Sequence, residues 1–89
     1  MFGVEWVQEA VDELADMWVN ADSQSRQAIT DATHELDREL QNDPYRESES
    51  REGDVRVAFA SPLGVLFEVN AQQRIVSILH VWAFRRGAS

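Results

Sequence analysis

The chain has 89 residues, of which 44% are apolar, and its 16 acidic against 8 basic side chains give a net charge of −8. This length suits a single small core, so we expect one domain over residues 1–89. The absence of cysteine excludes disulfides, and with only two histidines we expect no zinc site, no other metal and no cofactor. No apolar run approaches the roughly 20 residues of a membrane span and no signal-peptide pattern opens the chain, so we expect a cytoplasmic protein without membrane contact.

Charge is divided unevenly along the chain. Residues 1–54 carry 15 acids and 4 arginines, net −11, whereas residues 55–89 carry one acid, Glu68, and 4 arginines, net +3. The overall negative charge opposes non-specific binding to nucleic acid. All eight basic residues are arginine. Genomic base composition is the ordinary cause, and planar recognition of phosphate is the functional alternative.

The first half of the chain predicts a short strand and two helices. Residues 1–5 are apolar enough for a strand, and residues 7–19 repeat apolar side chains every three or four positions, as in a helix. A second helix is expected from Asp22 or Ser23, either of which suits an N-cap, to about Gln41, before Asp43-Pro44 ends it. The short connection between the helices predicts an antiparallel hairpin.

Residues 42–53 are dominated by charges and serines, so we expect an exposed loop. After it come three runs of β-branched and aromatic residues, which predict antiparallel strands at about 54–60, 63–69 and 74–82. In the first two strands the odd-numbered side chains are expected to face the helices. The predicted fold class is therefore α+β, with the hairpin on one face of a mainly antiparallel sheet of three to four strands.

The facing of the third strand has two alternatives. Either Ile75, Leu79 and Val81 face inward with Ser77, or Val76, Ile78 and Trp82 do so with Arg74 and His80. The first is preferred because the second buries an arginine and a histidine that would each need a partner. It leaves apolar side chains on the second face of the sheet, which predicts a partner interface there with Trp82 as an anchor. The residues of this predicted interface are Leu66, Val76, Ile78 and Trp82.

The chain resembles the RelE/ParE superfamily of toxins from type II toxin–antitoxin systems. The resemblance rests on VEWVQEAVDELADMW near the start, on LDRELQNDP at the end of the second helix, and on SREGDVRVAF followed by PLGVLFEVNAQQRIVSILHVW. It implies the order strand, helix hairpin and antiparallel strands. It also implies a growth inhibitor bound by a cognate antitoxin, with the ribosome and its mRNA or gyrase as the target.

The resemblance further implies basic residues that bind phosphate during mRNA cleavage, and Arg51, Arg56, Arg85 and Arg86 match that pattern. His80 is a candidate general acid or base because its ordinary pKa lies near neutral pH. The middle strand has Gly64-Val65-Leu66 and the tail opens with Ala83-Phe84, where the family pattern has basic residues, histidine or tyrosine. Catalytic residues are thus largely missing. The alternative function is a non-catalytic interaction module on the same scaffold, acting as a homodimer or an adaptor.

Overall fold

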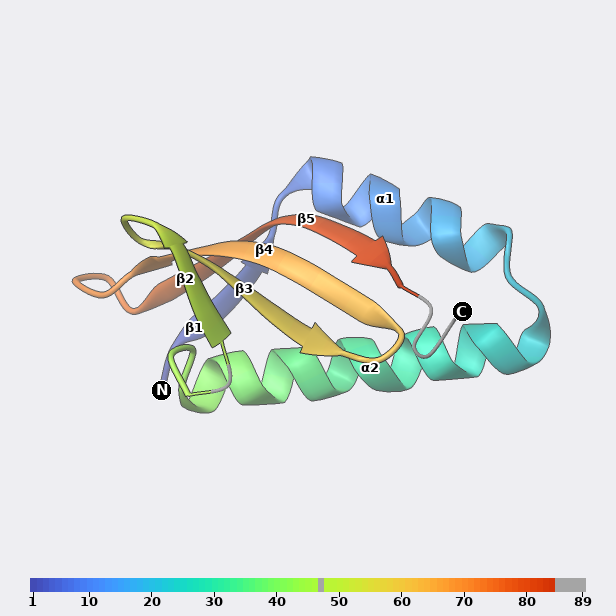
Figure 1. Cartoon of the computed structure of the whole chain (residues 1–89), viewed down its shortest axis with the longest axis horizontal. Helices are drawn as coiled ribbons and strands as arrows, with labels where there is room; N and C mark the ends of the chain where they lie inside the picture. The colour runs from blue at the N-terminus through green and yellow to red at the C-terminus, as the bar shows by residue number, and fades with distance from the viewer. Residues whose placement is uncertain (47, 85–89) are drawn as a thin grey trace.

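The computed structural model describes residues 1–46 and 48–84, and its α+β architecture confirms the predicted fold class (Figure 1). A five-stranded sheet has the order β1-β5-β4-β3-β2, in which only β1 and β5 run parallel. The two helices follow β1 as a hairpin. The elements are β1 (Gly3–Trp6), α1 (Gln8–Val19), α2 (Ser23–Asn42), β2 (Ser48–Glu52), β3 (Val55–Ala60), β4 (Leu63–Asn70) and β5 (Ile75–Ala83).

The strand β2 corrects two expectations, since residues 42–53 were predicted to be a loop and the sheet to have three to four strands. Ser48–Glu52 pairs antiparallel with β3 at the edge of the sheet. Gly53, with φ of +57°, provides the tight turn between them. The sequence SESRE contains only polar and charged residues, and none of its side chains is buried. Charged residues on an edge strand discourage pairing with another chain. Such a strand has no alternation of apolar and polar residues, so the sequence pattern did not reveal it.

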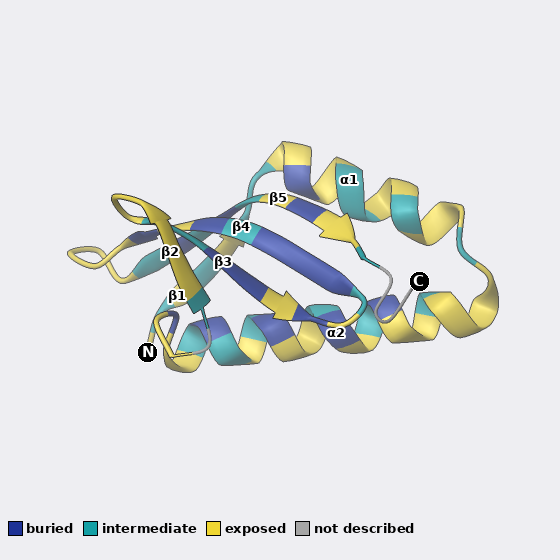
Figure 2. Cartoon of the chain, viewed as in Figure 1, coloured by how far each residue is buried: buried dark blue, intermediate teal, exposed yellow. Residues whose placement is uncertain are grey.

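The core lies between α2 and the sheet, with β4 at its centre (Figure 2). The odd-numbered residues of β4 are at most 2% exposed and belong to this core, as predicted. The helix α2 buries an apolar stripe with helical spacing, which packs against them. That stripe is Ile29, Ala32, Leu36 and Leu40.

In β3 the facing is opposite to the prediction. Ala58 lies opposite Val65 in the ladder and joins the core, whereas Phe59 lies opposite Gly64 and is 48% exposed. Residues opposite each other in an antiparallel pair share a face, so the even-numbered side chains of β3 face the helices. Two small residues, Ala58 and Ala60, therefore meet α2, and the larger odd-numbered side chains lie on the second face.

In β5 neither of the two regular alternations is right, because a β-bulge changes the facing within the strand. Val76 and Ile78 are fully buried and belong to the core, and so does Val81. The register shifts between Leu66, which lies opposite His80, and Phe67, which lies opposite Ile78. An extra residue in one strand moves the inner face from even to odd positions. The expectation that Val76 and Ile78 lie on the second face is therefore wrong.

The helix α2 begins after Asp22, which has the extended backbone of an N-cap and accepts a hydrogen bond from Ser25 N at 2.7 Å. That bond favours the carboxylate and lowers the pKa of Asp22 below its ordinary value of 3.8. A lowered folded-state pKa stabilises the protein above the unfolded-state pKa, and this contribution disappears as the pH falls through the folded-state pKa.

We therefore expect Asp22→Ala to be less stable than the parent protein at pH 7, and the difference to shrink as the pH falls below about 4. Urea unfolding of both proteins in a series from pH 7 to pH 2 measures this, at low protein concentration because the isoelectric point is near 4.5. A difference in midpoint that stays constant across the series would contradict the capping role.

Candidate functional site

The candidate catalytic residue Arg51 lies on the edge strand β2. Its guanidinium Nη1 is 3.4 Å from Glu49 Oε2, and both side chains are at least half exposed. An exposed ion pair of this kind contributes little to stability. Arg51 is therefore available to solvent, but its neighbour on the same strand already balances its charge.

Arg56 is held by the chain just before and at the start of β2. Its Nε donates to Ser48 Oγ at 2.6 Å, its Nη2 donates to Ser48 O at 3.0 Å, and its guanidinium lies 5.2 Å from the ring centre of Tyr45. Arg56 is opposite Phe67 in the ladder, so it belongs to the same face of the sheet as the core residues. These contacts give Arg56 a structural role in anchoring β2.

His80 lies on β5, where Nδ1 is 3.3 Å from Glu13 Oε2 of α1. Two strands, β4 and β3, separate the β5 of His80 from the β2 of Arg51, so the backbones of these two strands are roughly 14 Å apart at the usual strand spacing. Arg85 and Arg86 lie outside the described residues. Within residues 1–46 and 48–84, the candidate catalytic side chains are therefore dispersed and do not form one cluster. The described residues also contain no group of three His, Cys, Asp or Glu side chains placed to hold a metal ion.

Glu13 connects α1 to the end of β5 beyond Ile78, where no strand of the described residues pairs on the β1 side. The strand β1 pairs with β5 only as far as Ile78, after which Val7 N donates to Ile78 O at 3.0 Å and Glu13 Oε1 accepts from Val81 N at 3.0 Å. The helix thus satisfies backbone groups that the end of β1 leaves open.

Replacing Glu13 with alanine is expected to lower the free energy of unfolding by about 1–3 kcal/mol, because the N–H of Val81 loses its acceptor. Glu13→Gln keeps a side-chain oxygen and should retain most of the stability. Glu9→Ala is the matched control, since Glu9 is an exposed acid on the same helix. Equal urea midpoints for the Glu13→Ala and Glu9→Ala variants would show that Glu13 does not support β5.

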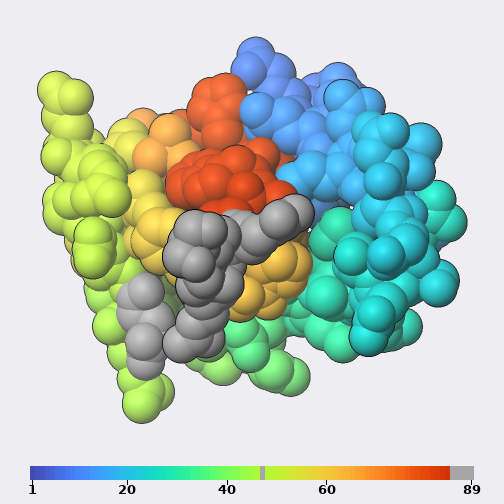
Figure 3. All heavy atoms as spheres, turned by 45° about the vertical axis from the view of Figure 1, so that its right-hand side comes forward, coloured from blue at the N-terminus to red at the C-terminus, as the bar shows by residue number. Residues whose placement is uncertain are grey.

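The second face of the sheet carries an aromatic cluster formed by Phe59, Trp82 and Phe84. The ring of Phe59 meets those of Trp82 and Phe84 edge to face, with centroids 6.2 and 5.6 Å apart. Trp82 lies over Gly64, because a Cβ at Gly64 would come within 2.6 Å of the indole. Phe59 is 48% exposed and Trp82 36% exposed. Figure 3 shows the end of β5 at the molecular surface, between the strands β2 and β3 on one side and α1 on the other.

Two of the four predicted interface residues, Leu66 and Trp82, lie on the second face, and Leu66 is partly exposed there. The other two are core residues, as described above. The sequence reasoning missed Phe59 and Phe84 because it placed Phe59 inside and left Phe84 in a tail. The signal that would have found Phe59 is the two-residue Ser61-Pro62 turn between β3 and β4, which pairs Ala60 with Leu63 and so places Phe59 opposite Gly64.

No protein-family model matches this chain, and no curated protein matches it in sequence. Solved structures do match in fold. The toxin–antitoxin complex RelBE2 from Mycobacterium tuberculosis has a TM-score of 0.74 at 14% identity, over 92% of this chain and 90% of that one. The chromosomal ParDE system from P. aeruginosa has a TM-score of 0.70 at 17% identity, over 96% and 98%. The isolated E. coli RelE toxin has a TM-score of 0.66 at 16% identity, over 98% and 88%.

Of the helices in the described residues, none is long and apolar enough to span a bilayer. The likeness to the solved structures covers between 92% and 98% of this chain. The protein therefore has the fold of the RelE and ParE toxins.

Proposed function

We propose that this protein is the toxin-like component of a RelE/ParE-type toxin–antitoxin module, a cytoplasmic growth inhibitor bound by a cognate antitoxin. The observation that carries the proposal is the fold likeness, with TM-scores of 0.74 and 0.70 to chains from RelBE2 and ParDE, both of which are toxin–antitoxin systems. The aromatic cluster adds support from the chain itself, because it leaves large apolar side chains exposed on an open sheet face.

In this proposal a segment of the antitoxin covers the aromatic cluster. Buried aromatic side chains near the centre of an interface contribute most of its binding energy, and Trp82 is already oriented by Phe59 and by the close approach to Gly64. Glu68 is the one acid on β3, β4 and β5, so the cluster has little charge of its own to desolvate. Leu66 extends the apolar surface toward the middle of β4.

Within the part of the chain that the structure describes, the candidate basic residues are dispersed, which favours inhibition by binding to a target over mRNA cleavage. Phosphoryl-transfer chemistry needs positive charge and a proton-transfer group placed together around one phosphate. Here the three candidate residues lie on three different strands, Arg51 on β2, Arg56 on β3 and His80 on β5. Each has a partner of its own: Glu49 for Arg51, Ser48 for Arg56 and Glu13 for His80. The same observation supports the second candidate, a non-catalytic interaction module that forms homodimers or acts as an adaptor.

Induced expression in a bacterial host tests the proposal. We expect growth arrest that is relieved by co-expressing a small open reading frame adjacent to the gene. Normal growth with a good soluble yield would contradict the toxin proposal and favour the interaction module.

The variant Arg51→Ala/His80→Ala distinguishes the two forms of toxicity. If the protein inhibits by binding, the arrest should persist in this variant, and ribosome-bound mRNA should stay intact in both proteins. Loss of the arrest together with mRNA cleavage by the parent protein would instead assign an endoribonuclease.

A further inference from the structure

The edge strand β2 is attached to the sheet without a buried side chain. None of the residues Ser48–Glu52 is buried, and the strand pairs with β3 alone (Figure 2). Its register with β3 is interrupted between Ser50 and Glu52. The ion pair of Arg51 with Glu49 lies within β2 and adds no link to β3. The strand therefore gains little from apolar burial, and segments of this kind open locally at a lower free energy than the core of the same domain.

One side chain of β3, Arg56, holds the start of β2. Its Nε and Nη2 donate to Ser48 Oγ and Ser48 O at 2.6 and 3.0 Å, and its guanidinium lies 5.2 Å from the ring centre of Tyr45. Ser48 Oγ in turn donates to Pro44 O at 2.6 Å. Opening of β2 must therefore break the contacts of Arg56 as well as the hydrogen bonds of the ladder.

The chain is fixed on either side of β2. Before the strand, Pro44 is fully buried. After it, Asp54 O accepts a hydrogen bond from Val69 N of β4 at 3.0 Å. Between β2 and this second anchor lies Gly53, whose φ of +57° is open to glycine and to few other residues. These anchors limit an opening to β2 and leave the rest of the sheet in place.

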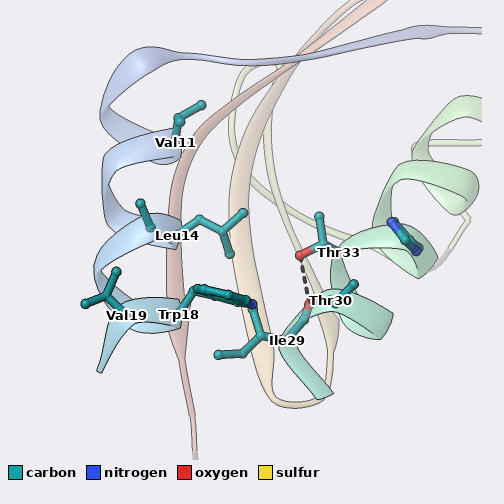
Figure 4. A pocket seen from close by; sticks show the side chains of 9 residues that line it. Val11, Leu14, Trp18, Val19, Ile29, Thr30 and Thr33 are labelled. Carbon is teal, nitrogen blue, oxygen red and sulfur yellow. Dashed lines mark hydrogen bonds between the residues drawn. The ribbon is translucent and has the colours of Figure 1, made fainter. Parts of the chain in front are cut away.

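The helix hairpin is held more firmly than β2. Leu14 and Trp18 of α1 point toward Ile29 of α2, and Ile29 belongs to the core (Figure 4). Arg26 of α2 also donates to the carbonyl of Trp18 at 2.8 Å. Because apolar and polar contacts both join the two helices, we expect low-energy opening at β2 and not at the hairpin.

Opening of β2 changes the second face of the sheet. Val57 lies on that face, opposite Leu66 of β4 and Glu49 of β2, and is 4% exposed. Loss of β2 removes the neighbour of Val57 on one side and uncovers the backbone edge of β3. The apolar surface formed by Phe59 and Leu66 then extends to Val57.

We propose that β2 is a strap, held by Arg56, whose local opening controls how much apolar surface the second face presents. In the closed state β2 flanks Val57 and pairs with the edge of β3. In the open state the second face has a longer apolar strip and a free strand edge, while the helices and the other strands keep their positions. The inference concerns the chain alone and does not depend on the toxin proposal.

Residue-resolved hydrogen exchange of the full chain, followed by NMR, tests the proposal. We expect the amides that join β2 and β3 to exchange about a hundredfold faster than those of β4, with one shared opening free energy. Low concentrations of urea should leave the exchange of β2 unchanged, because a local opening exposes little surface, and should accelerate the exchange of β4. A common rate and a common urea dependence for β2 and β4 would overturn the proposal.

Matched variants test the role of Arg56. Arg56→Ala should raise the opening equilibrium of β2 about tenfold or more, because two hydrogen bonds from a charged group are lost. Arg74→Ala removes an exposed arginine whose guanidinium lies 5.9 Å from the ring centre of Phe2, and should leave the opening of β2 unchanged. Ile29→Val weakens contacts that persist in the open state, so it should accelerate exchange in β4 about threefold without affecting β2.

A cross-link keeps the strap closed. Glu49 and Val57 lie directly opposite each other and the chain has no cysteine of its own, so Glu49→Cys/Val57→Cys can form a single disulfide. Oxidation of this variant should slow the amides between β2 and β3 to the rate of β4, and reduction should restore their fast exchange. Fast exchange in the oxidised variant, or equal effects of Arg56→Ala and Arg74→Ala on β2, would overturn the proposal.

Discussion

Replacing Phe67 with alanine is expected to lower the free energy of unfolding by about 3–5 kcal/mol, a large part of the 5–15 kcal/mol typical of a whole domain. Phe67 is fully buried at the centre of β4, so the substitution removes apolar contacts and leaves a cavity between the sheet and α2. Urea or thermal unfolding followed by circular dichroism measures the change. The variant is expected to be partly unfolded at 37 °C.

Phe59→Ala is the matched control, since it removes the same side chain from the opposite face of the neighbouring strand. Phe59 is 48% exposed and makes two edge-to-face ring contacts, so its loss should cost about 1–2 kcal/mol, clearly less than the loss of Phe67. Regular alternation of odd-numbered residues would place both Phe59 and Phe67 in the core. It would therefore predict that the two substitutions lower the free energy of unfolding by similar amounts. Similar costs in the experiment would therefore contradict the register in which Phe59 lies opposite Gly64.

The second large effect is expected at Gly64. An added Cβ would meet the indole of Trp82 at 2.6–2.8 Å, which is closer than van der Waals contact allows. Gly64→Ala should therefore displace Trp82 from the sheet and break up the aromatic cluster, at a cost of about 1–3 kcal/mol. Elsewhere in a strand the same substitution would be mildly stabilising, because glycine loses more conformational freedom on folding.

A double-mutant cycle with Trp82→Ala isolates this contact. In the Trp82→Ala background the added methyl no longer meets the indole, so Gly64→Ala should become neutral or slightly stabilising. The expected coupling energy is about 1–3 kcal/mol, obtained from the four free energies of unfolding. Additive effects of the two substitutions would show that Trp82 does not lie over Gly64.

The candidate site was only partly predictable from the sequence. Trp82 and Leu66 were predicted to be apolar residues on the second face because their strands have apolar side chains at both odd and even positions. Val76 and Ile78 were misplaced because the prediction assumed regular alternation through the whole of β5. Arg56 was assigned to phosphate chemistry from its position in the chain, although its structural partner, Ser48, lies on a strand that the sequence did not reveal.

Local patterns in the sequence were enough to predict the helix hairpin, the three apolar strands and the fold class. These features depend on local periodicity, which repeats every 3.6 residues in a helix and every two in a strand, so a single segment contains the whole signal. The inward facing of β4 also followed, since its alternation is uninterrupted and its odd positions hold the larger side chains.

The pairing of β2, the facing of β3 and the change of facing within β5 could be seen only in the folded chain. The strand β2 forms because β3 presents a free edge. The orientation of β3 follows from its ladder with β4 and from the space that Ala58 and Ala60 leave for α2. The bulge near His80 keeps Val81 in the core. At this position β1 no longer pairs with β5, and Glu13 of α1 accepts the hydrogen bond from Val81 N. Each of these depends on contacts between residues far apart in the chain, and hydrophobic periodicity within one segment carries no record of such contacts.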